Sequence, residues 1–124
     1  MKENQIFLQM CQAVSDDKYC RTHAIPGRCG EWVGGALKVL DSIVYCEDVT
    51  YSARRCLIEL GVTHTFIKIE VNDKCFIMDG TGHASQDPYF GPLESAPEIL
   101  QVSTSDPMNL YRSLNVDKRM CNRL

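Results

Sequence analysis

Three residues of this chain have side chains that could together carry out covalent chemistry: Cys29, His64 and Asp79. Cys29 lies within the run GRCGEW of residues 27–32, just ahead of a predicted helix. His64 lies on one predicted strand, and Asp79 lies at the end of the next. A thiol, an imidazole and a carboxylate in contact provide a nucleophile, a base and a group that orients the base. The three residue types predict a thiol enzyme that acts on acyl groups, above all amides.

The surroundings of the cysteine fit that chemistry. A thiolate one residue before a helix is stabilised by the helix dipole and by free backbone N–H groups. The same N–H groups can hold the oxyanion of a tetrahedral intermediate. Gly27 and Gly30 leave room for a substrate carbonyl, and Trp32 is expected to wall the site against water. His23, six residues before Cys29, is a further predicted oxyanion donor.

A hairpin register decides whether the histidine and the aspartate can meet. With a two-residue turn at residues 72–73, Phe66 faces Asp79 across the hairpin, so His64 and Asp79 share a face as diagonal neighbours. A carboxylate–imidazole hydrogen bond is within reach at that spacing. A slip of one residue would put them on opposite faces. His83 is a competing base, but it follows the strand and ranks below His64.

Each of these residue types also has a purely structural interpretation. A cysteine before a helix usually packs or caps, a histidine in a strand is usually a satisfied core or surface residue, and an aspartate before Gly-Thr-Gly is usually a turn residue. Trp32 and Phe66 are more typical of a core than of a substrate site. Glu31 favours the helix dipole but would oppose ionisation of a nearby thiol. Only the joint pattern favours catalysis.

Hydrophobic spacing predicts the elements that must position these residues. Helices are expected over residues 3–14 and 30–45, and from Ser105 or Asp106 to Leu114. A further helix is expected around Ala53, Cys56, Leu57 and Leu60, with Thr50 as its N-cap and Gly61 as its C-terminal stop. Strands are expected over 64–71, 75–79 and 99–102, and loops over 18–28 and 84–98. Helices followed by an antiparallel hairpin indicate an α+β fold, with the helices packed on one side of a small antiparallel sheet.

Composition bounds the function. The 124 residues fit a single catalytic domain over 1–124, and the net charge of −3 argues against a nucleic-acid partner. No apolar run reaches the roughly 20 residues that span a membrane, and residues 1–5 begin an amphipathic pattern rather than a signal peptide.

Seven cysteines without a Cys-x-x-Cys pair argue against a zinc site, a full disulfide framework and a redox or metal-binding protein. We therefore expect no metal and no cofactor. The expected setting is a reducing one, either the cytoplasm or the cytosol of a target cell after export.

Residues 27–82 resemble the transglutaminase-like and papain-like cysteine enzymes. The run GRCGEW resembles the nucleophile segment of cytosolic peptide:N-glycanases, and HTFIKI (residues 64–69) and FIMD (residues 76–79) resemble their histidine and aspartate motifs. The resemblance implies a transglutaminase/papain-like core with Cys29 as nucleophile, His64 as base and Asp79 as orienter. The paired zinc cysteines of the N-glycanases are not reproduced, so deglycosylation is not implied. The size is similar to that of small bacterial effector or toxin domains.

The resulting hypothesis is thiol-dependent acyl transfer or hydrolysis at an amide, foremost as a glutamine deamidase or transglutaminase acting on a protein. A cysteine protease or an amidase of the same fold is the alternative within the enzyme class. A non-catalytic binding module is the alternative outside it. The expected partners are a protein substrate and an inhibitor or immunity protein.

Overall fold

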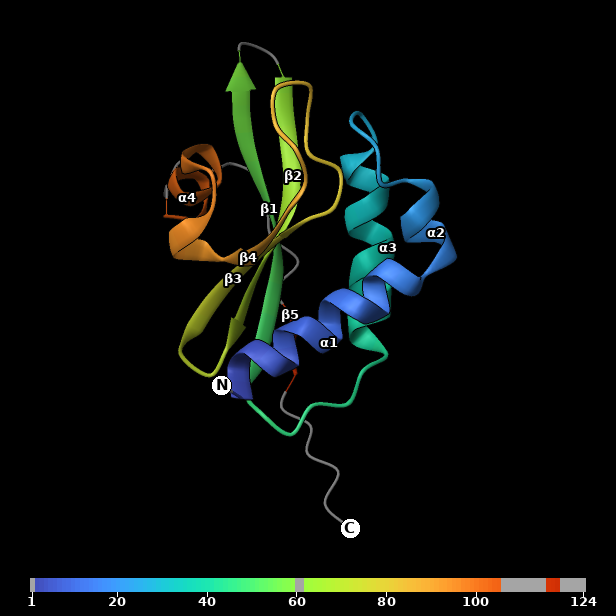
Figure 1. Ribbon diagram of the computed structural model, residues 1–124, viewed down its shortest axis with the longest axis vertical. Coiled ribbons are helices and arrows are strands. Elements are labelled where there is room, and N and C mark those ends of the chain that lie inside the picture. The colour runs from blue at the N-terminus through green and yellow to red at the C-terminus, as the bar shows by residue number, and fades with distance from the viewer. Residues whose placement is uncertain (1, 60–61, 106–115, 119–124) are drawn as a thin grey trace.

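A computed structural model of the chain describes residues 2–59, 62–105 and 116–118 (Figure 1). The helices are α1 (Lys2–Asp16), α2 (Lys18–Thr22), α3 (Cys29–Asp41), a short 3-10 helix (Leu93–Ser95) and α4 (Glu98–Ser105). The strands are β1 (Val49–Glu59), β2 (Val62–Val71), β3 (Lys74–Asp79), β4 (Tyr89–Pro92) and β5 (Val116–Lys118). The fold is α+β, as the sequence predicts.

The strands form one antiparallel sheet in the order β4-β3-β2-β1-β5. Figure 1 shows α1, α2 and α3 together on one side of this sheet and α4 on the other. The expectation that all helices pack on one side is therefore correct for the first three helices and wrong for α4. Both faces of the central strands are consequently buried.

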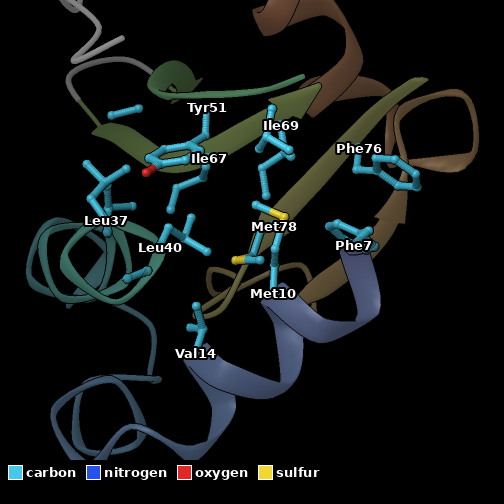
Figure 2. Close-up of a cluster of buried hydrophobic side chains, with 14 of the residues drawn as sticks. Phe7, Met10, Val14, Leu37, Leu40, Tyr51, Ile67, Ile69, Phe76 and Met78 are labelled. Carbon is cyan, nitrogen blue, oxygen red and sulfur yellow. The ribbon is translucent and has the colours of Figure 1, made fainter. Parts of the chain in front are cut away.

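The main core lies between the sheet and the first helices (Figure 2). Helix α1 contributes Phe7, Met10 and Val14, whose spacing places them on one side of a helix. Phe7 stacks on Phe76 of β3, with the ring centroids 4.4 Å apart. Residues of α3 and alternate residues of the strands complete the cluster, including Leu37, Leu40, Tyr51, Ile67, Ile69 and Met78. This layer fixes α3, and with it Cys29, against the sheet.

A second, smaller core covers the opposite face. Phe66 and Ile77 alternate with residues of the main core, and they pack there with Cys56, Ala96 and Leu100. Leu100 belongs to α4 and is completely buried. The sequence instead predicts a strand over residues 99–102, and that prediction is wrong because these residues belong to α4, in which Ile99 and Leu100 pack in the second core.

The helix expected around Ala53, Cys56 and Leu57 is also wrong, because these residues belong to β1. Ala53 is buried in the main core and Cys56 in the second core, while Leu57 is 59% exposed. The helical spacing arises because a strand buried on both faces need not alternate strictly. Thr50 is paired with Glu70 in the sheet rather than capping a helix. Gly61 and Leu60 lie outside the described residues.

The structure differs from the sequence prediction in smaller ways at the predicted loops and at the helix ends. Residues 18–28, expected as loop, contain α2, whose N-cap Asp17 accepts a hydrogen bond from the Cys20 N–H at 3.0 Å. The expected loop over 84–98 contains β4 and the 3-10 helix. Helix α3 ends at Asp41 rather than near residue 45. The helix expected from residue 105 or 106 to residue 114 lies outside the described residues beyond Ser105, where α4 ends.

The hairpin of β2 and β3 has the predicted register. Val71 pairs with Lys74 and Ile69 pairs with Phe76, on either side of the turn at residues 72–73. Asn72 has a φ of 55°, a left-handed conformation that asparagine tolerates well. His64, Phe66 and Asp79 therefore project toward the same face of the sheet.

Candidate active site

The site forms where the first residue of α3 approaches β2 and the end of β3. Cys29 is the first residue of α3, and the N–H of Trp32 donates the first i to i−4 bond, to the carbonyl of Arg28 at 2.9 Å. The N–H groups of Cys29, Gly30 and Glu31 have no acceptor within the helix. Cys29 is thus one residue further into the helix than the sequence predicts, and its own N–H is one of these free donors.

His64 and Asp79 form the predicted pair. Nε2 of His64 lies 2.7 Å from Oδ2 of Asp79, and the side chains are only 2% and 1% exposed. The second oxygen of Asp79, Oδ1, accepts the N–H groups of Gly82 at 3.0 Å and Thr81 at 3.3 Å. Asp79 is therefore both a turn residue and the partner of the histidine, because the turn holds one oxygen while the other oxygen faces the ring.

The thiol of Cys29 lies close enough to the His64 imidazole for each group to shift the pKa of the other. With Nε2 engaged by Asp79, the ring nitrogen left for the sulfur is Nδ1. The hydrogen bond with His64 lowers the pKa of the Cys29 thiol; burial opposes this, and the backbone and side chain of Thr65 add further hydrogen bonds that lower the pKa. The three residues are therefore linked from sulfur to carboxylate, by the mutual pKa effect of Cys29 and His64 and by the hydrogen bond of His64 to Asp79.

His64 is the centre of this chain. Burial disfavours its charged form, but hydrogen bonds to Asp79 and Cys29 outweigh burial and raise the pKa of the imidazole to about 9. A lowered thiol pKa next to a raised imidazole pKa is the signature of a thiolate–imidazolium pair.

Other cysteines show the opposite behaviour. Burial raises the pKa of the Cys11 and Cys20 thiols to about 12, and it also raises the pKa of the Cys75 thiol. These thiols behave as small apolar residues. Cys29 is thus distinguished from them by its environment rather than by its residue type.

The remaining predicted site residues have separate roles. Gly30 has open space where a side chain would project, which leaves access to the first turn of α3. Glu31 is turned toward Arg28, with which it forms an ion pair at 3.3 Å. His23 caps α2, stacks on Tyr19 and has Nδ1 2.8 Å from the Tyr19 carbonyl. In a neutral His23 ring this leaves a lone pair on Nε2, which cannot donate to an oxyanion.

Trp32 lies in the main core. It is 2% exposed and packs edge-on to Phe90, with the ring centroids 6.2 Å apart. A Cβ atom at Gly80 would clash with the Trp32 indole, so the residue after Asp79 must be glycine for the ring to fit. Trp32 also lines an apolar cavity of about 300 Å³ with Gly80, Phe90 and Pro88. Its contacts support the turn that holds Asp79.

Sequence reasoning missed two neighbours of the imidazole and thiol. Thr65 hydrogen-bonds to Cys29, and nothing in a threonine on a strand signals this contact. His83 packs its ring edgewise against His64, with the centroids 5.4 Å apart. The sequence identifies His83 only as a competing base. In the structure His64 contacts Asp79, and His83 lies next to His64.

Within residues 2–59, 62–105 and 116–118, no group of three or more histidine, cysteine or acidic residues is placed to hold a metal ion. No helix among them is long and apolar enough to cross a membrane. No protein-family model, curated protein or solved structure matches this chain.

Proposed function

We propose that the chain is a cysteine enzyme that transfers or hydrolyses the acyl group of an amide. The observation that carries the proposal is the contact chain from Cys29 through His64 to Asp79, together with the lowered thiol pKa. Buried structural pairs of histidine and aspartate are common, but a third contact to a polarised thiol at a helix N-terminus is not needed for packing. It is needed for nucleophilic catalysis.

The geometry supports the following mechanism. The Cys29 thiolate attacks the amide carbonyl carbon, and the carbonyl electrons move to the oxygen, which the N–H groups of the first turn of α3 can bind. The His64 imidazolium donates its proton to the departing nitrogen, so ammonia or an amine leaves and a thioester remains. Water or a second amine, deprotonated by His64, then attacks the thioester and releases the thiol. Asp79 holds the ring and stabilises its charge throughout.

We further propose that the substrate is a glutamine side chain of a protein, so that the enzyme is a deamidase or transglutaminase. The open space at Gly30 supports access by a side-chain carboxamide to the first turn of α3. In this proposal the protein works in a reducing cytosol, either its own or that of a target cell. An inhibitor or immunity protein would then be its second partner.

The test is intact-mass analysis of a glutamine-rich protein such as β-casein, incubated with the enzyme in the presence and absence of a primary amine. A gain of about one mass unit per site indicates deamidation, an amine adduct indicates transfer, and fragments indicate proteolysis. Cys29→Ser and His64→Ala should each abolish the product while the far-ultraviolet circular dichroism stays unchanged. Product from both variants in the same amount as from the unmodified protein would refute the proposal.

A binding module is the second candidate. The burial of both His64 and Asp79 favours it, because a fully enclosed pair serves packing as well as chemistry. Iodoacetamide labelling near neutral pH separates the two functions. An enzyme should label first at Cys29, whereas a binding module should label Cys29 no faster than the exposed Cys46.

A further inference from the structure

Two side chains beside the candidate site carry a buried nitrogen with no hydrogen-bond partner. They are Nε2 of His83 and Nε2 of Gln86, and no other buried side-chain nitrogen or oxygen in the described part of the chain is in this state. A buried polar atom without a partner destabilises the folded protein, so its presence in a native structure needs an explanation. Two such atoms occur here within four residues of one loop.

Both nitrogens are hydrogen-bond donors. Nδ1 of His83 accepts the N–H of Ser85 at 3.4 Å, so the proton of the neutral ring belongs on Nε2. Nε2 of Gln86 is an amide nitrogen and donates in every state. The N–H groups at Nε2 of His83 and Nε2 of Gln86 can therefore both be satisfied by an acceptor oxygen.

The loop holds the two donors on one side. His83 and Gln86 form an isolated antiparallel bridge, with each N–H 2.9 Å from the carbonyl oxygen of the other. Residues that are directly opposite in such a bridge project toward the same face. Gly82 precedes the bridge with a φ of 62°, and a Cβ atom there would clash with the Gln86 carbonyl. The turn is therefore closed tightly and specifically.

The same loop is fastened to the candidate site. The Gly82 N–H donates to Oδ1 of Asp79, and the His83 ring lies against His64. The two donors are thus positioned by the carboxylate that also positions the proposed base. A group bound to them would lie next to the imidazole.

We propose that His83 and Gln86 form a subsite that binds a carbonyl oxygen of the peptide substrate beside the thiol and the imidazole. The inference rests on the proposed function, whose protein substrate it describes more closely. A carbonyl oxygen accepts two hydrogen bonds, which matches the two donors. Residues 80–90 contain no lysine or arginine and include Asp87, so the loop favours a neutral acceptor over an anion. The subsite positions the peptide for attack and takes no part in bond breaking.

A pair of alkylating probes tests the subsite directly at Cys29. Bromoacetyl-glycine methylamide carries two peptide carbonyls, whereas allyl bromide has no hydrogen-bond acceptor. In both reactions the thiolate sulfur forms a bond to carbon and bromide leaves. The measured quantity is the ratio of the two rate constants at Cys29, read by peptide mass spectrometry and divided by the same ratio for glutathione.

Gln86→Leu and His83→Phe each remove one donor and keep the bulk of the side chain. Each should lower the ratio by about fivefold, the effect of one neutral hydrogen bond. The ratio is compared rather than either rate constant, because the His83 ring also lies against His64. Ser85→Ala, which alters an exposed side chain of the same loop, is the matched control and should keep the ratio of the unmodified protein. Gln86→Glu replaces the donor by an acceptor and should lower the ratio further.

Stability provides a second readout. Because the two nitrogens have no protein partner, Gln86→Leu should leave the midpoint of urea unfolding unchanged or raise it. A structural role for Gln86 would lower that midpoint. A lower ratio of rate constants together with an unchanged or higher unfolding midpoint indicates a role in binding, whereas a lower midpoint indicates a role in packing.

Ratios that stay the same in Gln86→Leu, Gln86→Glu and His83→Phe would overturn the subsite, whatever the midpoints do. A different result would show that the proposed function itself is wrong. In that case allyl bromide would label Cys29 of the unmodified protein no faster than it labels Cys46.

Discussion

Asp79→Asn isolates the contribution of one carboxylate oxygen to the reactivity of a thiol that it does not touch. Asparagine can keep an oxygen in the place of Oδ1, which accepts the N–H groups of Gly82 and Thr81, so the turn should persist. It replaces Oδ2, 2.7 Å from Nε2 of His64, by an amide N–H₂ group. The imidazolium then loses its acceptor, and the ring is left to the burial that disfavours its charge.

The size of the effect follows from the bond that is lost. A hydrogen bond to a charged group contributes about 1.5–3 kcal/mol, which corresponds to about 1–2 pKa units. The pKa of His64 should fall from about 9 by that amount, and the pKa of the Cys29 thiol should rise because its cationic partner is weakened. The ratio of the thiolate–imidazolium pair to the neutral pair should fall about 10- to 100-fold.

The assay is the rate of iodoacetamide labelling at Cys29 between pH 5 and pH 10, read by mass spectrometry of the Cys29 peptide. In the unmodified protein the rate should rise through a pKa below the ordinary thiol value. In Asp79→Asn the same rise should occur at higher pH. Asp73→Asn is the matched control, because Asp73 is an exposed carboxylate of the hairpin turn and its loss changes the net charge equally.

An Asp79→Asn protein that labels at the same rate and with the same pH dependence as Asp73→Asn would refute the reasoning. It would show that the buried carboxylate serves the turn alone. Unchanged far-ultraviolet circular dichroism is required of both variants, so that a lost fold is not mistaken for a lost hydrogen bond.

Three further outcomes are expected. The rate of ammonia release from a substrate should increase as the pH rises through the lowered pKa of Cys29. It should decrease as the pH rises through about 9, because His64 then loses the proton that it donates to the leaving group. The rate of iodoacetamide labelling needs no such proton and should show no decrease near that pH. Gly80→Ala should destabilise the protein by about 1–3 kcal/mol in urea unfolding, because the added methyl group meets the Trp32 ring. Leu100→Ala should cost about 2–5 kcal/mol in the same measurement, because Leu100 of α4 is completely buried in the second core.

The hairpin of β2 and β3 and its His64–Asp79 pair could be predicted from the sequence because two local rules agree. Side chains of a strand alternate, and the turn at residues 72–73 sets which residues face each other. Those rules place His64 and Asp79 on one face without any knowledge of the remaining fold. The register of β2 and β3 in the structure confirms this, and the 2.7 Å contact follows from it.

Strand β1 and helix α4 could not be predicted in this way because their sequences are ambiguous. Ala53, Cys56 and Leu57 fit a helical repeat, yet two of them fill opposite cores of a doubly buried strand. Residues 99–102 contain β-branched side chains that favour a strand, yet they form part of α4. In both elements, burial on the second face of the sheet decides the structure, and that face is assembled from distant parts of the chain.

The contact between Cys29 and His64 depends on an arrangement that no local pattern specifies. Helix α3 packs on the face of the sheet that contains Ile67 and Ile69. His64 is paired with Cys56, a residue of the second core, and so projects to the other face. The pairing of β2 with β3 ends at Ile67 and Met78, so residues 64–66 have no pairing with β3 on that side.

An unpaired strand edge exposes backbone N–H groups, and the Thr65 backbone hydrogen-bonds to Cys29 at that edge. The end of the β2–β3 pairing therefore leaves free the part of β2 with which Cys29 interacts, although α3 and the His64 side chain lie on opposite faces of the sheet. An insertion that lengthened the pairing of β3 with β2 by two residues would close this edge and separate the thiol from the imidazole.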